Sequence, residues 1–432
     1  MNPAFGSFGQ LGWDRITEMT ASDPHTVVMK TKEVYAPFVS YMASSGSFIS
    51  PSKEIAKGVD SFKQQFGQAP VGTGPFKFVE WKAKEQITLN ANPNYWGGKP
   101  KLDQVLVKIV PDDNTLLVQL RTGEVQVAAG AAILSATRVD EAMQIDKITV
   151  YQYPTLYWNH LDLKQMSHLR QTKVRQALDF ATPTAQIISQ LLKGRAGQAI
   201  ADVAPSSWAY NGNVQPRPYD LNQAAQLLTE AGLTKNNGVW EGPTPADDAV
   251  SENGTPVAAS PVAEGATPQA TTLDLSGPVK PLEIELWSLS GDTQAQNISQ
   301  VIAASWGQLG VKVTQKNEDI STIWGPNGYQ FTQAMTAAFF SWQNSVDPDD
   351  AYYWSSTQIP ADPTGTGGNL PAYFHKYTFQ AQIDQLTAAG ATELDQEKRK
   401  AIYFQIQELL HEEVPVIFMY WPRGFPAAIK NL

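Results

Sequence analysis

The 432-residue sequence contains no cysteine and only five histidines. The absence of cysteine excludes disulfide bonds, zinc–thiolate sites and cysteine nucleophiles. With so few histidines, a transition-metal site built by the protein itself is also disfavoured. We therefore expect neither a bound metal nor any other cofactor.

The chain also has no excess of positive charge and no long apolar run. Its 32 lysines and arginines stand against 42 aspartates and glutamates, which gives a net charge of −10. Nucleic-acid binding requires a clustered basic surface, so nucleic acid is excluded as a partner. No apolar run approaches the length that crosses a bilayer. These properties describe a globular protein with room for two or three domains.

Catalytic motifs are missing as well. No Walker loop or G-x-S-x-G motif occurs, and the sequence around His411 lacks the second histidine of a zincin motif. Asp347, Asp349 and Asp350, with a tryptophan nearby, could be read as the carboxylates of a carbohydrate-active hydrolase. That reaction needs two acids that face each other across a cleft, whereas three acids in one turn are explained more simply as a solvated helix start. We expect a binding protein, with the hydrolase as the alternative of another class.

The most distinctive stretch of the sequence is residues 71–127. A GTGP turn at 72–75 precedes two stretches of alternating apolar residues. Between them, an Asn-Pro-Asn turn and a Gly-Gly-Lys-Pro turn enclose the aromatic pair at 95–96. A helix should follow, capped by Asp112 or Asp113 and ended at Gly123.

This order of turns, aromatics and cap resembles the signature block of the peptide/nickel-type solute-binding proteins of ABC importers. In that family, GTGPF is followed by N-P-x-Y-W-x-G-K-P and by a helix that ends in G-E-V-D; here Gln126 replaces the last acid. The alternative is an ordinary hairpin and helix of an unrelated α/β protein. The V-R-Q-A-L segment at 174–178, where Arg175 is expected to be structural, matches the family too.

The resemblance implies an α/β fold of the periplasmic-binding-protein type (type II, cluster C). Two lobes with mixed sheets would be joined by a hinge, with the remnant of a small accessory subdomain. We expect the remnant at 1–65, an incomplete lobe I at 66–157, lobe II at 158–418, and a return crossing to lobe I at 419–432. Residues 241–280 are rich in Ala, Pro, Thr, Ser and Gly and lack periodicity, which predicts a disordered insertion.

The first residues lack the basic and apolar regions of a signal peptide. Members of the resembled family normally begin with such a signal and with a first strand–helix block, and they usually continue further at the C-terminal end. We expect a shortened chain, produced by truncation, by processing or by a late-called start. An extracytoplasmic location, periplasmic or anchored at the membrane surface, is implied by the resemblance alone.

The resemblance also implies a receptor that closes around a solute by hinge bending and presents it to the transmembrane subunits of an ABC permease. We expect a monomer that binds an oligopeptide in an interlobe cleft, with an oligosaccharide as the alternative ligand. Peptide-binding relatives often hold the peptide's amino terminus with an aspartate just after the tryptophan of the ligand strand. Asn344 and Ser345 occupy that neighbourhood here, which leaves room for a neutral ligand.

Candidate ligand contacts come from three segments. The strand from Ser341 to Ser345 would offer backbone hydrogen bonds to the ligand, as in strand addition. Two further segments lie at the expected crossings between the lobes. Each aromatic candidate could equally be a core residue. The full set is Ser341, Trp342, Gln343, Asn344, Ser345, Asp347, Trp158, Asn159, Tyr420 and Trp421.

Overall fold

A computed structural model describes residues 13–43, 48–110, 112–129, 136–247, 271–363 and 367–430. The chain divides into two compact units, one formed by residues 1–153 and 424–432 and the other by 154–423. The main chain therefore passes between the units twice, after Tyr153 and after Arg423. Within the described ranges, no helix is both long enough and apolar enough to cross a membrane.

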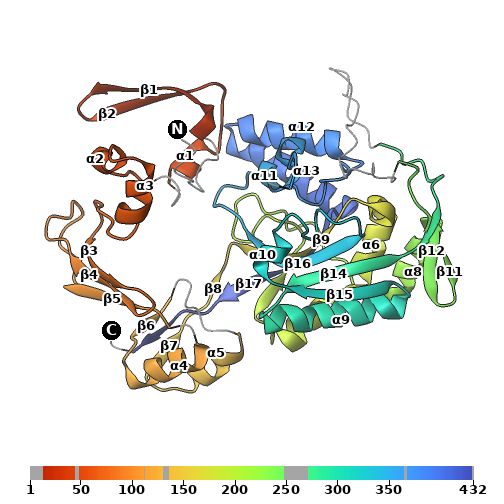
Figure 1. Ribbon diagram of the computed structural model, residues 1–432, viewed down its shortest axis with the longest axis horizontal. Coiled ribbons are helices and arrows are strands. Elements are labelled where there is room, and N and C mark those ends of the chain that lie inside the picture. Colours follow the sequence, from red (N-terminus) through yellow and green to blue (C-terminus); the bar gives the residue numbers. More distant parts are fainter. Residues whose placement is uncertain are drawn as a thin grey trace. The chain divides into compact units, whose positions relative to one another are not determined.

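The larger unit is built on a seven-stranded mixed sheet (Figure 1). The strand order is β10-β17-β9-β16-β14-β15, and β8 pairs with β17. β14 is parallel to β15 and β16, whereas β9 is antiparallel to β16 and β17, and β10 is antiparallel to β17. The strands are β8 (Tyr153–Pro154), β9 (Tyr157–Leu163), β10 (Ala196–Gln198), β14 (Glu283–Leu289), β15 (Lys312–Glu318), β16 (Thr336–Gln343) and β17 (Val416–Gly424).

Helices cover both faces of this sheet because successive strand residues point to opposite sides. On β9, Leu161 and Leu163 enter one core and Trp158 enters the other. The first core includes residues of α6 (Thr172–Phe180), α8 (Leu221–Glu230) and α9 (Thr293–Leu309). The second includes residues of α11 (Ala351–Trp354), α12 (Gln380–Thr392) and α13 (Gln396–Glu413). The apolar residues of 282–313 alternate, then recur at helical spacing, then alternate again, which predicts two parallel strands joined by a helix. The parallel strands β14 and β15, connected by α9, confirm this prediction.

A small antiparallel sheet includes both ends of the segment that was predicted to be a disordered insertion. β11 (Thr234–Asn236), β12 (Val239–Pro243) and β13 (Val279–Pro281) pair in that order, so both ends of the expected disordered segment are strands. Only the middle of that segment, residues 248–270, lies outside the described residues. The pairing joins residues far apart in sequence, and a Cβ at Gly242 would lie 2.9 Å from Leu233 Cγ. The glycine and proline content of this segment therefore led to a prediction of disorder where β12 is a close-packed strand.

The described residues of the smaller unit form three separate antiparallel sheets. The first is a hairpin of β1 (Ile16–Asp23) and β2 (Thr26–Thr31). The second consists of β3 (Phe76–Lys82), β4 (Gln86–Ala91) and β5 (Gln104–Lys108). In the third, β18 (Ala427–Ile429) lies between β6 (Val127–Ala128) and β7 (Ile148–Val150). Helices α1 (Phe38–Met42), α2 (Ser52–Ile55), α3 (Val59–Ser61), α4 (Asp113–Thr122) and α5 (Ala136–Met143) complete its main elements.

Helix α4 begins and ends as the sequence predicts. Its N-cap, Asp112, accepts a hydrogen bond from the Thr115 N–H at 2.8 Å. Gly123 follows the last turn with φ of 80°, a left-handed conformation that favours glycine. Leu116, Leu117 and Leu120 are buried in the core of this unit together with Ala427 of the returning strand.

Candidate ligand-binding site

Among the described strands, none pairs with the last residues of β16 on the side of β14, and we call this side the uncovered edge. β16 pairs with β9 as far as Gln343, opposite Tyr157, but its pairing with β14 ends at Phe339. Backbone amides and carbonyls alternate between the two edges of a strand. Even-numbered residues bond toward β9, since Thr336 O accepts from the Lys164 N–H at 3.1 Å. Odd-numbered residues bond toward β14, since Met335 O accepts from the Glu285 N–H at 3.0 Å.

By this alternation, the backbone of Ser341 and Gln343 faces the side that β14 no longer covers. The Gln343 carbonyl accepts a hydrogen bond from the Tyr353 hydroxyl at 3.0 Å. Ser341 lies between this carbonyl and the end of β14, and its side chain is exposed. The edge at Ser341 is therefore placed to hydrogen-bond with an extended ligand.

Aromatic side chains surround Trp342, which is half-buried. Its ring centroid lies 5.4 Å from that of Tyr353 and 5.7 Å from that of Trp324. Phe340 and Tyr352 lie at 6.1 and 6.5 Å. Trp324 is 39% exposed, so this cluster is open to solvent in part. Partly exposed aromatic faces can bind apolar side chains or sugar rings.

A hollow of about 110 Å³ lies beside the loop that follows β16. Its walls are apolar and neutral polar side chains, with one carboxylate among them. The lining residues are Leu156, Val203, Ala204, Ser206, Ser207, Trp208, Asn344, Ser345, Val346, Asp347 and Pro348. Three predicted contacts, Asn344, Ser345 and Asp347, are thus brought together at one place.

Asp347 is not a free acid in this hollow. Arg399 forms a bidentate ion pair with it, at 2.8 Å from Nη1 to Oδ2 and 2.7 Å from Nη2 to Oδ1. Both side chains are buried, and Arg399 Nε donates to the Gly390 carbonyl at 2.7 Å. The carboxylate of Asp347, one of the predicted ligand contacts, therefore already has a positively charged partner within the protein.

Three of the predicted aromatic contacts are core residues. Trp158 is 1% exposed and stacks on His160, with ring centroids 4.1 Å apart. Its indole N–H donates to Asn344 Oδ1 at 2.7 Å. Tyr420 and Trp421 are buried in the cores on opposite faces of the sheet. Asn159 is half-buried, with Ser341 on one neighbouring strand and Tyr420 on the other.

The geometry does not support the hydrolase alternative. Asp350 is buried, and burial together with the nearby Asp202 and Asp349 raises its pKa well above its ordinary value. Burial also raises the pKa of Asp202 to about 6, and its Oδ2 accepts from Trp354 Nε1 at 2.7 Å. Asp347 is paired with Arg399, so no two of the three acids form an open catalytic pair.

Several aromatic residues near Trp342 and the hollow were not predicted from the sequence. Tyr352 and Tyr353 stand in the Ala-Tyr-Tyr-Trp segment that directly follows the aspartates, and this run of aromatics was an available signal. Trp324 follows the short helix α10 (Ile320–Ile323), and Trp208 lies in a loop. The residues next to Trp208 and Trp324 in sequence show no pattern that indicates binding. Both tryptophans are far from β16 in sequence, and only the folded chain places them near it.

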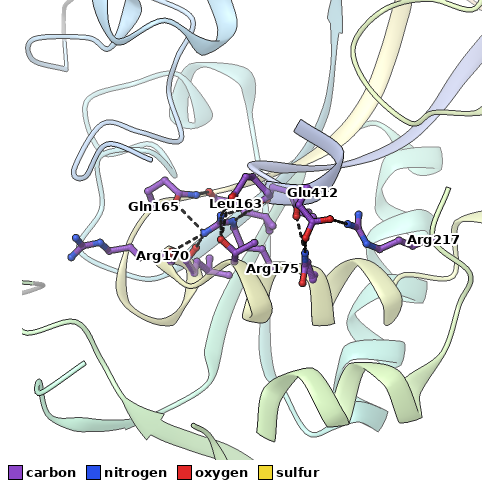
Figure 2. Close-up of polar contacts among 11 residues, drawn as sticks. Leu163, Gln165, Arg170, Arg175, Arg217 and Glu412 are labelled. Atoms are coloured by element: carbon purple, nitrogen blue, oxygen red, sulfur yellow. Dashed lines mark hydrogen bonds and ion pairs between the residues drawn. The ribbon is translucent and has the colours of Figure 1, made fainter. Parts of the chain in front are cut away.

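A second polar cluster in the same unit surrounds the buried Arg175 (Figure 2). Arg175 has no exposed surface, and its Nε and Nη2 donate to the Glu413 carbonyl at 3.0 and 2.7 Å. Its Nη1 donates to the carbonyls of Leu169 and Arg170 at 2.8 and 2.9 Å. Burial lowers the pKa of Arg175 to about 10, so it stays charged at neutral pH. This arginine caps the C-terminal end of α13, a structural role.

Residues 1–361 match the family model described as bacterial extracellular solute-binding proteins, family 5 Middle. The chain belongs to this family, whose members are binding proteins rather than enzymes. This confirms the resemblance seen in the sequence and places the protein in an extracellular or periplasmic family.

Several curated proteins are similar along most of the chain. It is 27% identical over 369 residues to the oligopeptide-binding protein AppA of Bacillus subtilis, covering 84% of this chain and 59% of AppA. It is 26% identical over 432 residues to the dipeptide-binding protein of Escherichia coli, covering 96% and 68%. It is 26% identical over 362 residues to heme-binding protein A of Haemophilus influenzae, which covers 82% of this chain and 55% of that protein. The chain thus spans 55–68% of the length of these relatives.

Solved structures show the same fold. NikZ from Campylobacter jejuni in complex with Ni(L-His) matches with a TM-score of 0.75 at 20% identity, covering 100% of this chain and 76% of NikZ. AppA from Bacillus subtilis in complex with a nonapeptide matches with a TM-score of 0.72 at 24% identity, covering 99% and 78%. The expected α/β periplasmic-binding-protein fold with mixed sheets is confirmed.

Proposed function

We propose that this protein is the solute-binding receptor of an ABC importer and that it binds an oligopeptide for delivery to the membrane permease. The observation that carries the proposal is the uncovered edge of β16 at Ser341. An extended peptide can pair with such an edge through main-chain hydrogen bonds, which do not depend on its sequence. The two chain crossings, after Tyr153 and after Arg423, are the proposed hinge.

The names of the relatives favour a peptide over other solutes. AppA and the Escherichia coli protein are named for oligopeptide and dipeptide binding. Other relatives are named for heme or were solved with a nickel complex. In the described part of the chain, no group of three or more His, Cys, Asp or Glu side chains is arranged to hold a metal ion. A peptide is therefore the first ligand to test.

The aromatic cluster around Trp342 supports a second candidate of the same receptor type, an oligosaccharide. Sugar rings stack on tryptophan and tyrosine faces, and Trp342 and Trp324 both retain exposed surface. Peptides and cello- or xylo-oligosaccharides can be separated by a thermal-shift screen, because a ligand that binds only the native state raises the melting temperature. No stabilisation by any peptide would contradict the oligopeptide proposal.

Substitutions at Ser341 test the strand-addition geometry directly. Ser341→Pro removes the backbone N–H on the uncovered edge without removing a hydrogen bond to β9, and proline is tolerated on strand edges. We expect peptide affinity to fall about three- to tenfold, the effect of losing one hydrogen bond. Ser341→Ala keeps the backbone and should bind as the wild type does. Equal affinities of the two variants, measured by calorimetry, would contradict this geometry.

A further inference from the structure

The hollow beside the end of β16 presents no free charge to a ligand. We propose that it receives a neutral group of the ligand, such as a blocked terminus or an uncharged side chain, rather than a free ammonium group. This inference rests on the proposed function, because it defines the chemistry accepted by part of the same site.

The walls of the hollow are mostly apolar. Leu156, Val203, Ala204 and the half-buried Trp208 supply the apolar surface, and Asp347 is the one charged side chain among its lining residues. A volume of about 110 Å³ is several times the roughly 30 Å³ that one water occupies in the liquid. A small acyl cap or a medium-sized side chain would fit this volume.

The carboxylate of Asp347 is already occupied. Both of its oxygens bind Arg399, and Oδ1 also accepts from the Asp349 N–H at 3.0 Å. An incoming ammonium group would have to compete with this buried bidentate pair, and breaking such a pair is costly. The guanidinium carbon of Arg399 also lies 5.7 Å from the centre of the Trp208 ring.

The neutral polar side chains of the loop are also engaged. Ser345 Oγ donates to the Asp347 carbonyl at 2.9 Å and accepts from the Asp347 N–H at 3.1 Å. Asn344 accepts from the Trp158 indole, and its Nδ2 donates to the Asp202 carbonyl. The polar side chains of Asn344, Ser345 and Asp347 therefore already have partners within the protein.

The test compares matched peptides with a free or an acetylated amino terminus, titrated into the full chain by calorimetry at pH 7. The wild type should bind the acetylated form at least as well as the free form. Ser345→Asp adds an unpaired carboxylate at the rim and should gain about a tenfold preference for the free form. Ser345→Asn is the matched neutral control and should not. Ser345 is exposed, and both replacements can form the same type of turn, so folding should be retained.

A wild type that prefers the free form by tenfold or more would overturn the inference while leaving the proposed function intact. So would a wild-type affinity for free peptides that falls above pH 8, where an amino terminus loses its proton. Binding of a neutral oligosaccharide, with no peptide bound in either form, would support the neutral hollow and overturn the oligopeptide function. Binding of neither class would overturn both.

Discussion

The Arg175 cluster and the end of β16 lie in the same unit, yet they use their polar groups differently. Each nitrogen of the Arg175 guanidinium donates to acceptors within the protein, and the side chain has no exposed surface (Figure 2). At the end of β16, the backbone of Ser341 faces an uncovered edge, and Trp342 and Trp324 retain exposed surface. Satisfied, buried polar groups hold the fold together, whereas uncovered backbone beside aromatic faces is available to a ligand.

Replacing Arg175 should have the largest effect of any change to these two regions. Arg175→Met leaves several buried carbonyls at the end of α13 without donors, and we expect a loss of about 3–5 kcal/mol in the free energy of unfolding. Urea denaturation measures the loss. Lys173→Met is the matched control, since Lys173 is exposed and its pair with Glu230 at 2.8 Å should contribute less than about 1 kcal/mol. Similar losses in both variants would contradict the structural role of Arg175.

Much of the fold could be predicted because its signals are local. The cap at Asp112, the left-handed Gly123 and the β14–α9–β15 crossover each depend on residues close together in sequence. The strands β12 and β13 could not be predicted, because residues 248–270 separate them in sequence and because they contain glycine and proline.

The candidate site was predicted less well, because contacts between distant residues decide which side chains are free. Trp158 and Trp342 stand directly opposite each other on paired strands, but only Trp342 retains exposed surface. From the sequence, Asp347 was expected to be an exposed acid. Its partner Arg399 is 52 residues further along the chain. The β-strand alternation at Ser341 was predictable; the neutralisation of Asp347 was not.

Asp202 and Asp350 differ from both regions, because they are buried beside the site and incompletely paired. Neither oxygen of Asp350 has a hydrogen-bond partner among the described residues. Since folding raises the pKa of both acids, the native state binds more protons than the unfolded chain, and stability should increase as pH falls through the folded-state pKa values. For Asp202, the change from 3.8 to about 6 corresponds to about 3 kcal/mol.

Asp350→Asn should therefore be more stable than the wild type at pH 7, because it removes a buried charge without hydrogen-bond partners, and the difference should shrink toward pH 4. Burial lowers the pKa of His411 to about 4, which acts in the opposite direction between pH 6.5 and 4. Comparing the variant with the wild type at each pH removes this shared contribution. A stability difference that does not change with pH, measured by urea denaturation, would contradict the prediction.

The smallest expected effect, and the most specific, separates the two opposed tryptophans of β9 and β16. Trp342→Ala should lower ligand affinity about tenfold, or about 1.4 kcal/mol, because it removes partly exposed aromatic surface at the site. Trp158→Phe keeps a buried ring but removes the N–H bonded to Asn344, so it should cost about 1–2 kcal/mol of stability and leave affinity near that of the wild type. Calorimetric titration and urea denaturation of both variants measure the two quantities. If Trp158→Phe weakened binding and Trp342→Ala did not, the ligand would contact the residues beside Trp158 instead of the open face of β16.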